Sequence, residues 1–207
     1  MNTDRSSSLT SSDPSRSLSI KIVILGNSSV GKTCLLSRFC DNIFLEGGMP
    51  TIAIDLRKKL IVQNEFSANV EFWDTAGQER YHSLAKNFLR GADGVIFAFD
   101  LTDEQSFESL PIWVEVASEC TEGKIPSLVL GNKCDQGNKE VTLVRANDFA
   151  EKIGSVFWEV SARDRTNVEE AIVSLIRRIA EVEIAKGAGS KKNKLKGKDE
   201  RETGKCC

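Results

Sequence analysis

The octet at residues 26–33, with the sequence GNSSVGKT, limits the possible folds of this chain more than any other segment. It lies between an apolar run at residues 20–25 and a helical pattern that begins near Gly31. Glycines let backbone N–H groups face phosphate oxygens, and the N-terminus of the following helix attracts the same anion. Lys32 adds a positive charge, and Thr33 offers a hydroxyl to Mg²⁺. The octet therefore predicts a nucleotide-binding phosphate loop, because a simple Gly/Ser turn would not explain the flanking strand and helix.

Continuous apolar runs elsewhere in the chain predict a mostly parallel sheet. The runs at residues 20–25, 94–99 and 127–130 are continuous rather than alternating, which is typical of strands covered on both faces, and VFWEV at 156–160 is a further candidate strand. Residues 52–73 differ, because two β-rich stretches flank a short polar link and predict an antiparallel hairpin. We therefore expect an α/β fold of three layers, α/β/α, as in P-loop NTPases. Its sheet would have six strands, mostly parallel, with one antiparallel strand.

Helical segments between the strands carry start signals. Thr102 with Gln105, and Thr166 with Glu169, have the spacing of a capping box. In the last helix, apolar residues recur at three- and four-residue spacing and predict one face that packs on the sheet. These residues are Val168, Ala171, Ile172, Leu175, Ile176 and Ile179.

Composition divides the chain into three parts. Residues 1–19 include eight serines and little apolar surface, so we expect a disordered Ser-rich extension. Residues 20–186 form the expected folded domain, and residues 187–207 are expected to be a solvated, variable linker. The last 22 residues, 186–207, hold eight Lys/Arg and three Asp/Glu, whereas residues 20–185 hold 18 Lys/Arg and 25 Asp/Glu. An acidic body argues against nucleic acid as the main partner, since duplex binding usually needs a basic face.

Several residue types have simple explanations. Four of the six cysteines lie within the expected domain without disulfide-like pairing or metal-ligand spacing: Cys34, Cys40, Cys120 and Cys134. Together with the lack of an apolar signal segment, they predict a reduced, cytosolic chain. His82, the only histidine, is expected to be a surface or partner contact rather than a catalytic group. Trp113 and Trp158 are expected to be core or helix–sheet contacts.

Polar residues follow three of the expected strands. Asp74 begins the segment DTAGQ, where a carboxylate beside the phosphate loop can hold Mg²⁺ and Gly77 lets a backbone N–H approach the terminal phosphate. Residues 132–135, NKCD, and 161–163, SAR, follow the next two strands. Asp135 can accept hydrogen bonds from the ring N–H and the exocyclic amine of guanine, whereas adenine offers neither donor there. An unpaired buried carboxylate is costly, so this residue favours guanine strongly.

The four motifs GNSSVGKT, DTAGQE, NKCD and SAR, in this order, resemble the Ras superfamily of small GTPases. Finer features resemble its Rab branch: TIAIDL at residues 51–56, Trp73 before Asp74, QERY at 78–81, FLRGA at 88–92 and the terminal Cys206-Cys207. The match covers about residues 19–183. The resemblance implies a GTP/GDP molecular switch that hydrolyses GTP slowly to GDP and phosphate. It also implies that the GTP-loaded form recruits effectors in vesicle-mediated membrane traffic.

The resemblance also implies a role for each matching residue. The nucleotide-binding residues would be Ser28, Ser29, Val30, Gly31, Lys32, Thr33, Cys34, Phe44, Thr51, Gly77, Asn132, Lys133, Asp135, Ser161, Ala162 and Arg163. Among them, Phe44 would lie against the guanine ring. Mg²⁺ would be held by Thr33, Thr51 and Asp74, and Gln78 would orient the attacking water. Effector contacts would be Ile52, Leu56, Trp73 and Phe88.

Some positions depart from the usual Rab pattern, namely Gly48, Ala53, Leu56 and Arg163. None of these changes removes an essential ligand. Leu56 replaces a usual Phe among the effector contacts, so the choice of effectors is expected to differ. The resemblance implies that the segment around Thr51 is a first switch, which changes conformation with the bound nucleotide. Glycines at 47 and 48 predict that this segment is looser and that nucleotide exchange is faster.

The two terminal cysteines have no trailing residues of a C-a-a-X box, and the Rab resemblance implies that Cys206 and Cys207 are geranylgeranylated. Two lipid chains anchor firmly, and the basic tail adds attraction to anionic lipid. Implied partners are a guanine nucleotide exchange factor, a GTPase-activating protein, a GDP-dissociation inhibitor, an escort protein with a geranylgeranyl transferase, and effectors. The implied location is the cytoplasmic face of endomembranes, with a cytosolic pool. RYHSL at residues 80–84 resembles endosomal members.

Two functions of other classes remain as alternatives. A scaffold could hold nucleotide permanently without turnover, but Gln78, Thr51 and Asp74 favour hydrolysis. A P-loop kinase or ATPase would bind ATP, but residues 132–135 favour guanine. Phosphate release in a single turnover and competition between nucleotides distinguish these alternatives from the switch.

Overall fold

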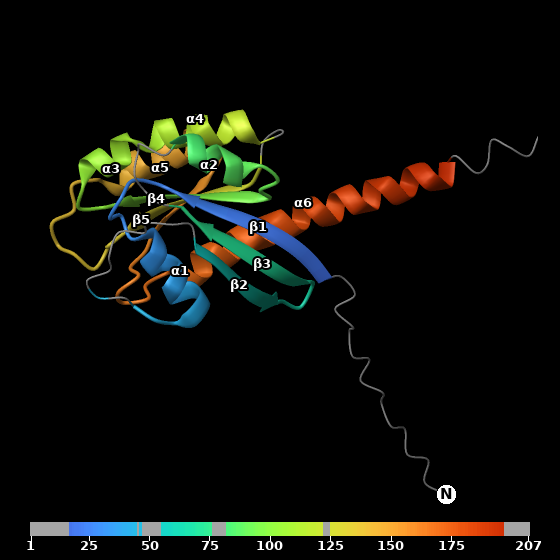
Figure 1. Ribbon diagram of the computed structural model, residues 1–207, viewed down its shortest axis with the longest axis horizontal. Helices are drawn as coiled ribbons and strands as arrows, with labels where there is room; N and C mark the ends of the chain where they lie inside the picture. The colour runs from blue at the N-terminus through green and yellow to red at the C-terminus, as the bar shows by residue number, and fades with distance from the viewer. Residues whose placement is uncertain (1–16, 45, 47–54, 76–81, 122–124, 197–207) are drawn as a thin grey trace, which may run out of the picture.

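The computed structural model describes residues 17–44, 46, 55–75, 82–121 and 125–196. Its centre is a six-stranded sheet with the strand order β2-β3-β1-β4-β5-β6 (Figure 1). The strands are β1 (Ser17–Leu25), β2 (Asp55–Val62), β3 (Ser67–Asp74), β4 (Gly94–Asp100), β5 (Ser127–Asn132) and β6 (Val156–Glu159). The helices are α1 (Lys32–Asp41), α2 (His82–Leu89), α3 (Glu104–Glu108), α4 (Leu110–Cys120), α5 (Leu143–Lys152) and α6 (Val168–Lys196).

The strand directions confirm the predicted sheet. β2 pairs antiparallel with β3, and the hairpin turn is closed by the N–H of Gln63, which donates to the carbonyl of Phe66 at 2.9 Å. β3 and β4 flank β1 in parallel, and β5 and β6 continue in the same direction. The carboxyl ends of β1, β3, β4, β5 and β6 therefore meet at one edge of the sheet, where ligands bind in open α/β folds.

Helices cover both faces of the sheet, as expected for an α/β/α fold (Figure 1). On one face α1 and α6 pack against the strands, with Leu35 and Phe39 from α1 and Ile172 from α6 in the core. On the other face lie α2, α3, α4 and α5, and Trp113 of α4 is part of this second core. β4 lies between the two cores and is buried along its whole length, which explains its continuous apolar run.

The ends of the folded region differ from the expected boundaries. β1 begins at Ser17 rather than at residue 20, because Ser17 to Ser19 pair with Ser67 to Asn69 of β3. Composition predicted disorder from side chains alone, whereas this pairing depends on the backbone. α6 continues to Lys196, ten residues into the expected linker. In residues 187–196, Ala188, Leu195 and four Lys favour helix and Pro is absent, whereas Gly187 and Gly189 disfavour it.

The predicted capping boxes were wrong. α3 begins at Glu104, and its N-cap is Asp103, whose carboxylate accepts hydrogen bonds from the N–H of Gln105 and of Ser106. Thr102 instead donates its hydroxyl to Asp100. α6 begins at Val168, and the carbonyl of Thr166 accepts from the N–H of Ser161 at 3.0 Å. Thr166 therefore fixes the loop that follows β6.

None of the described helices has an apolar stretch sufficient to cross a membrane.

Candidate nucleotide-binding site

The loop between β1 and α1 approaches its neighbours so closely that two positions require glycine. Gly26 has φ +144°, and a Cβ there would lie 2.0 Å from the carbonyl oxygen of Ala98. Gly31, the N-cap of α1, has φ +95°, and a Cβ would lie 2.4 Å from Nδ2 of Asn132. L side chains rarely adopt these φ values, so both glycines are required by backbone conformation as well as by space.

Lys32 lies inside the phosphate loop rather than in solvent. Its side chain is 5% exposed, and its Nζ donates to the carbonyls of Gly26 at 2.8 Å and Asn27 at 2.7 Å. Burial lowers the pKa of Lys32 to about 8, and the nearby Asp74 carboxylate offsets part of this effect. The loop thus holds a cation at its centre, where the anionic phosphates of a nucleotide are expected.

The hydroxyl of Thr33 donates to Oδ2 of Asp74 at 2.5 Å, which joins the start of α1 to the end of β3. Asp74 is fully buried, and burial raises the pKa of its carboxyl group, although the Thr33 hydrogen bond opposes the shift. Its Oδ1 accepts no hydrogen bond from the described residues. A buried carboxylate oxygen without a donor, beside a hydroxyl oxygen, fits a hard divalent cation such as Mg²⁺.

Asn132 connects the phosphate loop to the loop after β6. It lies buried at the end of β5, and its Nδ2 donates to the carbonyl of Val30 at 2.8 Å. Its Oδ1 accepts from the N–H of Ala162 at 3.1 Å. One amide side chain therefore fixes two of the predicted nucleotide-binding segments relative to each other.

The Asp135 carboxylate is fixed by the same loop. The hydroxyl of Ser161 donates to Oδ1 of Asp135 at 2.7 Å and accepts from the N–H of Asp164 at 3.0 Å. Lys133, which has φ 64°, forms an ion pair between its Nζ and Oδ2 of Asp100 at 2.5 Å. The carboxylate predicted to select guanine is exposed rather than buried, and it is held through one oxygen, Oδ1, by Ser161.

The structure brings most of the predicted nucleotide-binding residues to the carboxyl edge of the sheet. Ser28 and Ser29 form the turn before Val30, Cys34 lies in the first turn of α1, and half-buried Phe44 follows that helix. Arg163 follows Ala162 in the loop after β6. Other predicted residues lie outside the described residues: Gly48, Thr51, Ile52, Ala53, Gly77, Gln78, Cys206 and Cys207.

Three of the predicted effector contacts share one surface. Leu56 of β2 is 40% exposed and is paired in register with Trp73 of β3. The Trp73 ring stacks on Phe88 of α2, with 5.6 Å between ring centroids, and Nζ of Lys21 lies 4.7 Å from its centroid. These residues form a mixed apolar and cationic patch beside the start of β2 and the end of α2.

Sequence inspection missed two supports of this site. Trp113, expected to be a core residue, is buried but also donates its indole N–H to Oδ1 of Asn27 in the phosphate loop at 2.9 Å. Nδ2 of Asn27 donates to the hydroxyl of Ser109 at 3.0 Å. Arg38 of α1 donates to the carbonyls of Ala162 and Arg163. No local sequence pattern signals these contacts, because the partners lie 82 or more residues apart.

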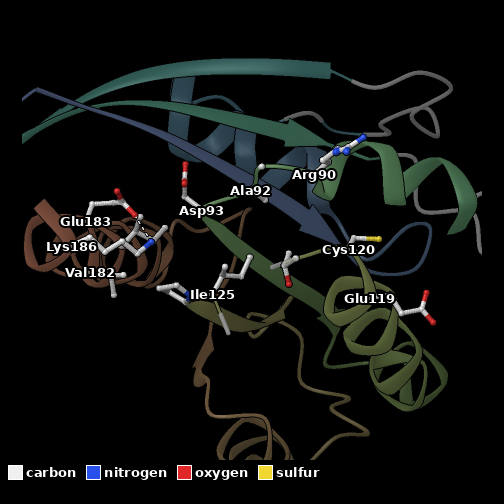
Figure 2. Close-up of a pocket in the computed structure, with 13 residues that line it drawn as sticks. Arg90, Ala92, Asp93, Glu119, Cys120, Ile125, Val182, Glu183 and Lys186 are labelled. Carbon is white, nitrogen blue, oxygen red and sulfur yellow. Dashed lines mark hydrogen bonds and ion pairs between the residues drawn. The ribbon is translucent and has the colours of Figure 1, made fainter. Parts of the chain in front are cut away.

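A separate cavity of about 660 Å³ lies near the amino ends of β4 and β5 (Figure 2). Figure 2 shows Glu183 and Lys186 of α6 on one side, Glu119 and Cys120 of α4 on the other, and Ile125 between them. None of the predicted nucleotide-binding residues within the described ranges lines it. The motifs and this cavity therefore lie at opposite edges of the sheet.

Comparisons with known proteins agree with the site. A family model described as the Ras family matches residues 21–181. The chain is 36% identical over 171 residues to Ras-related protein RABD2a of Arabidopsis thaliana, covering 82% of this chain and 84% of that protein. It is 36% identical over 162 residues to GTP-binding protein YPT1 of Saccharomyces cerevisiae, covering 78% and 79%. It is also 41% identical over 164 residues to human EF-hand calcium-binding domain-containing protein 4B, covering 79% of this chain but 22% of that protein. The chain therefore belongs to the Ras family and is a Rab-like small GTPase, a GTP-binding protein that hydrolyses GTP.

Proposed function

We propose that this GTPase uses the carboxyl edge of its sheet as a magnesium-dependent GTP/GDP switch. The observation that carries the proposal is the contact between Thr33 and the buried Asp74, directly beside Lys32. This arrangement offers one cation and two oxygen ligands at the start of a helix. A helix N-terminus with these groups is suited to a magnesium-bound phosphate chain.

Thr33 and Asp74 would hold Mg²⁺, with Thr51 as a further ligand when the γ-phosphate is present. When bound, the ion neutralises phosphate charge. Lys32 supplies a fixed positive charge, which the carbonyls of the loop already orient. In the loop after β5, Asp135 would accept from the guanine ring N–H and amine, because the hydroxyl of Ser161 orients its carboxylate.

Hydrolysis requires a water oxygen to attack the γ-phosphorus while the bond to the bridging oxygen of GDP breaks. The protein has no covalent step to perform, so its task is to orient the water and stabilise charge. Gln78 is proposed to orient the water, and a backbone N–H at Gly77 to contact the γ-phosphate. Loss of that phosphate releases Thr51 and Gly77, so both switch segments relax and the GTP-dependent effector surface is lost.

The surface formed by Leu56, Trp73 and Phe88 is the proposed effector contact, together with Ile52. It includes Phe88 of α2, the helix that follows Gly77 and Gln78, so a change in this proposed second switch segment would alter the surface directly. The exposed Leu56 presents an aliphatic side chain to the partner. Effectors that need an aromatic ring at this position are expected to bind weakly.

The test uses purified full-length protein. We expect GTP to displace bound fluorescent GDP, and ATP to fail at a thousandfold higher concentration, because adenine leaves Asp135 unpaired. In a single turnover, wild-type protein should release phosphate from bound GTP, and Gln78→Leu should release it at least tenfold more slowly. Equal displacement by ATP would contradict the switch and favour a kinase or ATPase. GTP binding without phosphate release would favour a permanent scaffold.

We further propose that geranylgeranyl groups on Cys206 and Cys207 attach the protein to the cytoplasmic face of endomembranes, with endosomes as the favoured compartment. Nine residues, 197–205, lie between the end of α6 and Cys206, and the basic tail would attract anionic lipid. The proposed partners are an exchange factor, a GTPase-activating protein, a GDP-dissociation inhibitor, and an escort protein with a geranylgeranyl transferase. Removal of both cysteines should leave the protein in the soluble fraction of cells. Continued pelleting with membranes would contradict the lipid anchor.

A further inference from the structure

Arg38 lies in the last turn of α1 and contacts two segments at the base end of the site. Its Nε donates to the carbonyl of Ala162 at 2.8 Å, and one terminal nitrogen donates to the carbonyl of Arg163 at 3.0 Å. The other terminal nitrogen donates to the carbonyl of Asn42 at 3.0 Å. A planar guanidinium can satisfy three such acceptors at once, which the single ammonium of lysine cannot do in the same plane.

Ala162 is held through both of its backbone polar groups. The N–H of Ala162 donates to Asn132, and its carbonyl accepts from Arg38. Asn132 extends this connection to the phosphate loop through the carbonyl of Val30. Loss of Arg38 would therefore free the carbonyl of Ala162, a residue of the predicted guanine pocket.

The same guanidinium supports the opposite wall of that pocket. Asn42 is the C-cap of α1 and has φ 60°, a left-handed conformation that turns the chain toward Phe44. The central guanidinium carbon of Arg38 lies 5.9 Å from the centroid of the Phe44 ring. An Arg over an aromatic face at this distance is attracted to the ring.

We propose that Arg38 is a positioning residue of the guanine pocket, which joins the wall carrying Phe44 to the wall formed by Ala162 and Arg163. This inference rests on the proposed placement of the base between these walls. Arg38 would not touch the nucleotide. It would slow nucleotide release, because the base can leave only when the two walls separate.

A purely structural role for Arg38 is the alternative. Arg178 of α6 provides a control position for this alternative. It is also half-buried on a helix, and it donates to the backbone carbonyl of Ser127 at 3.1 Å. Ser127 is the first residue of β5, so this contact lies at the end of the sheet away from the base motifs. The two arginines therefore differ in their distance from the proposed pocket, and Arg38 also contacts three carbonyls where Arg178 contacts one.

The test measures the rate at which fluorescent GDP dissociates from the purified full-length protein in excess unlabelled GDP. We expect Arg38→Lys to increase this rate by about tenfold, since hydrogen bonds from a charged donor to carbonyls are lost. Arg178→Lys should stay within about twofold of wild type. Should Arg38→Lys fail to fold, Arg38→Gln, which keeps one amide donor, is measured instead.

A double-mutant cycle with Phe44→Leu distinguishes an effect of Arg38 on the pocket walls from a general loosening of the fold. If Arg38 acts through the two walls, the rate increase in the double variant should be smaller than the product of the two single increases. A wild-type rate in Arg38→Lys, or single effects that multiply, would overturn the inference. Failure of wild-type protein to bind GDP would instead contradict the proposed function.

Discussion

The indole N–H of Trp113 donates to the side-chain oxygen of Asn27, 2.9 Å away, and so joins α4 to the second residue of the phosphate loop. Ser109, which precedes α4, accepts from the Asn27 amide nitrogen. The other end of α4 pairs with α2 through Glu119 and Lys86, at 2.6 Å. α4 thus contacts the phosphate loop near its start and α2 near its end.

Trp113→Phe keeps an aromatic ring in the core but removes the donor to Asn27. We expect a loss of about 1 to 3 kcal/mol in the free energy of unfolding and faster release of GDP, because the half-buried Asn27 oxygen loses its donor and the smaller ring leaves a cavity in the core. Thermal denaturation and GDP dissociation measure the two effects. Trp158→Phe is the control, since the buried Nε1 of Trp158 has no hydrogen-bond partner among the described residues. Similar effects in both variants would mean that ring size, not the hydrogen bond, supports the loop.

Nucleotide affinity should depend on pH through Lys32. Burial lowers the pKa of Lys32 to about 8 in the protein without nucleotide, and bound phosphate would favour the charged form. Below this pH the ammonium is present before binding. Above it, binding must also take up a proton, so affinity for GDP should fall by up to about tenfold for each pH unit above 8. Calorimetric titration of GDP between pH 7 and 9 measures this.

The control for the pH effect is Lys32→Met, which cannot take up the proton. Its GDP affinity should be much lower than that of wild type at pH 7, and should lose the decrease above pH 8. An equal pH dependence in both proteins would assign the proton to another group.

Asp74→Asn should increase the stability of the protein while weakening its binding of Mg²⁺. The Asp74 carboxylate is fully buried, its pKa is raised mainly by desolvation, and Oδ1 has no described hydrogen-bond donor. A neutral amide removes a costly buried charge, so we expect about 1 kcal/mol more stability in nucleotide-free protein with a metal chelator present. GDP release should at the same time lose most of its dependence on Mg²⁺ concentration. A destabilised variant with unchanged Mg²⁺ dependence would contradict the role of Asp74 as a metal ligand.

The sequence predicted those parts of the site whose residues directly follow a strand in the chain. Each motif follows an apolar run, and parallel strands bring their carboxyl ends together, so Lys32, Asp74, Asn132 and Ser161 could be placed at one edge before their contacts were known. The sheet was predictable for the same reason. The hairpin at β2 and β3 interrupts the alternation of strand and helix in the sequence itself.

Contacts between distant side chains could not be predicted in this way. Arg38 is an ordinary helix residue in the sequence, and its partners lie 124 and 125 residues away. The N-cap Asp103 was missed because Thr102 matched the same pattern one residue earlier, and only geometry distinguishes them. The first residues of β1 are serines, whose place in the sheet depends on backbone pairing with β3.

Alanine substitution at three glycines can measure how tightly the phosphate loop packs. Gly26 lies in that loop, and Gly91 and Gly137 are comparison positions outside it. A Cβ at Gly26 would lie 2.0 Å from a backbone carbonyl oxygen, at a φ of +144°, so Gly26→Ala should cost more than about 3 kcal/mol of stability and abolish GDP binding. Gly91 has φ +71° with no atom within 4 Å, so Gly91→Ala should cost only about 1 kcal/mol. Gly137 has neither constraint, so Gly137→Ala should be neutral or slightly stabilising. Urea denaturation of the three variants gives this order if the loop is as tightly packed as its geometry indicates. A Gly26→Ala variant as stable as Gly91→Ala would mean that the β1–α1 loop can move away from Ala98.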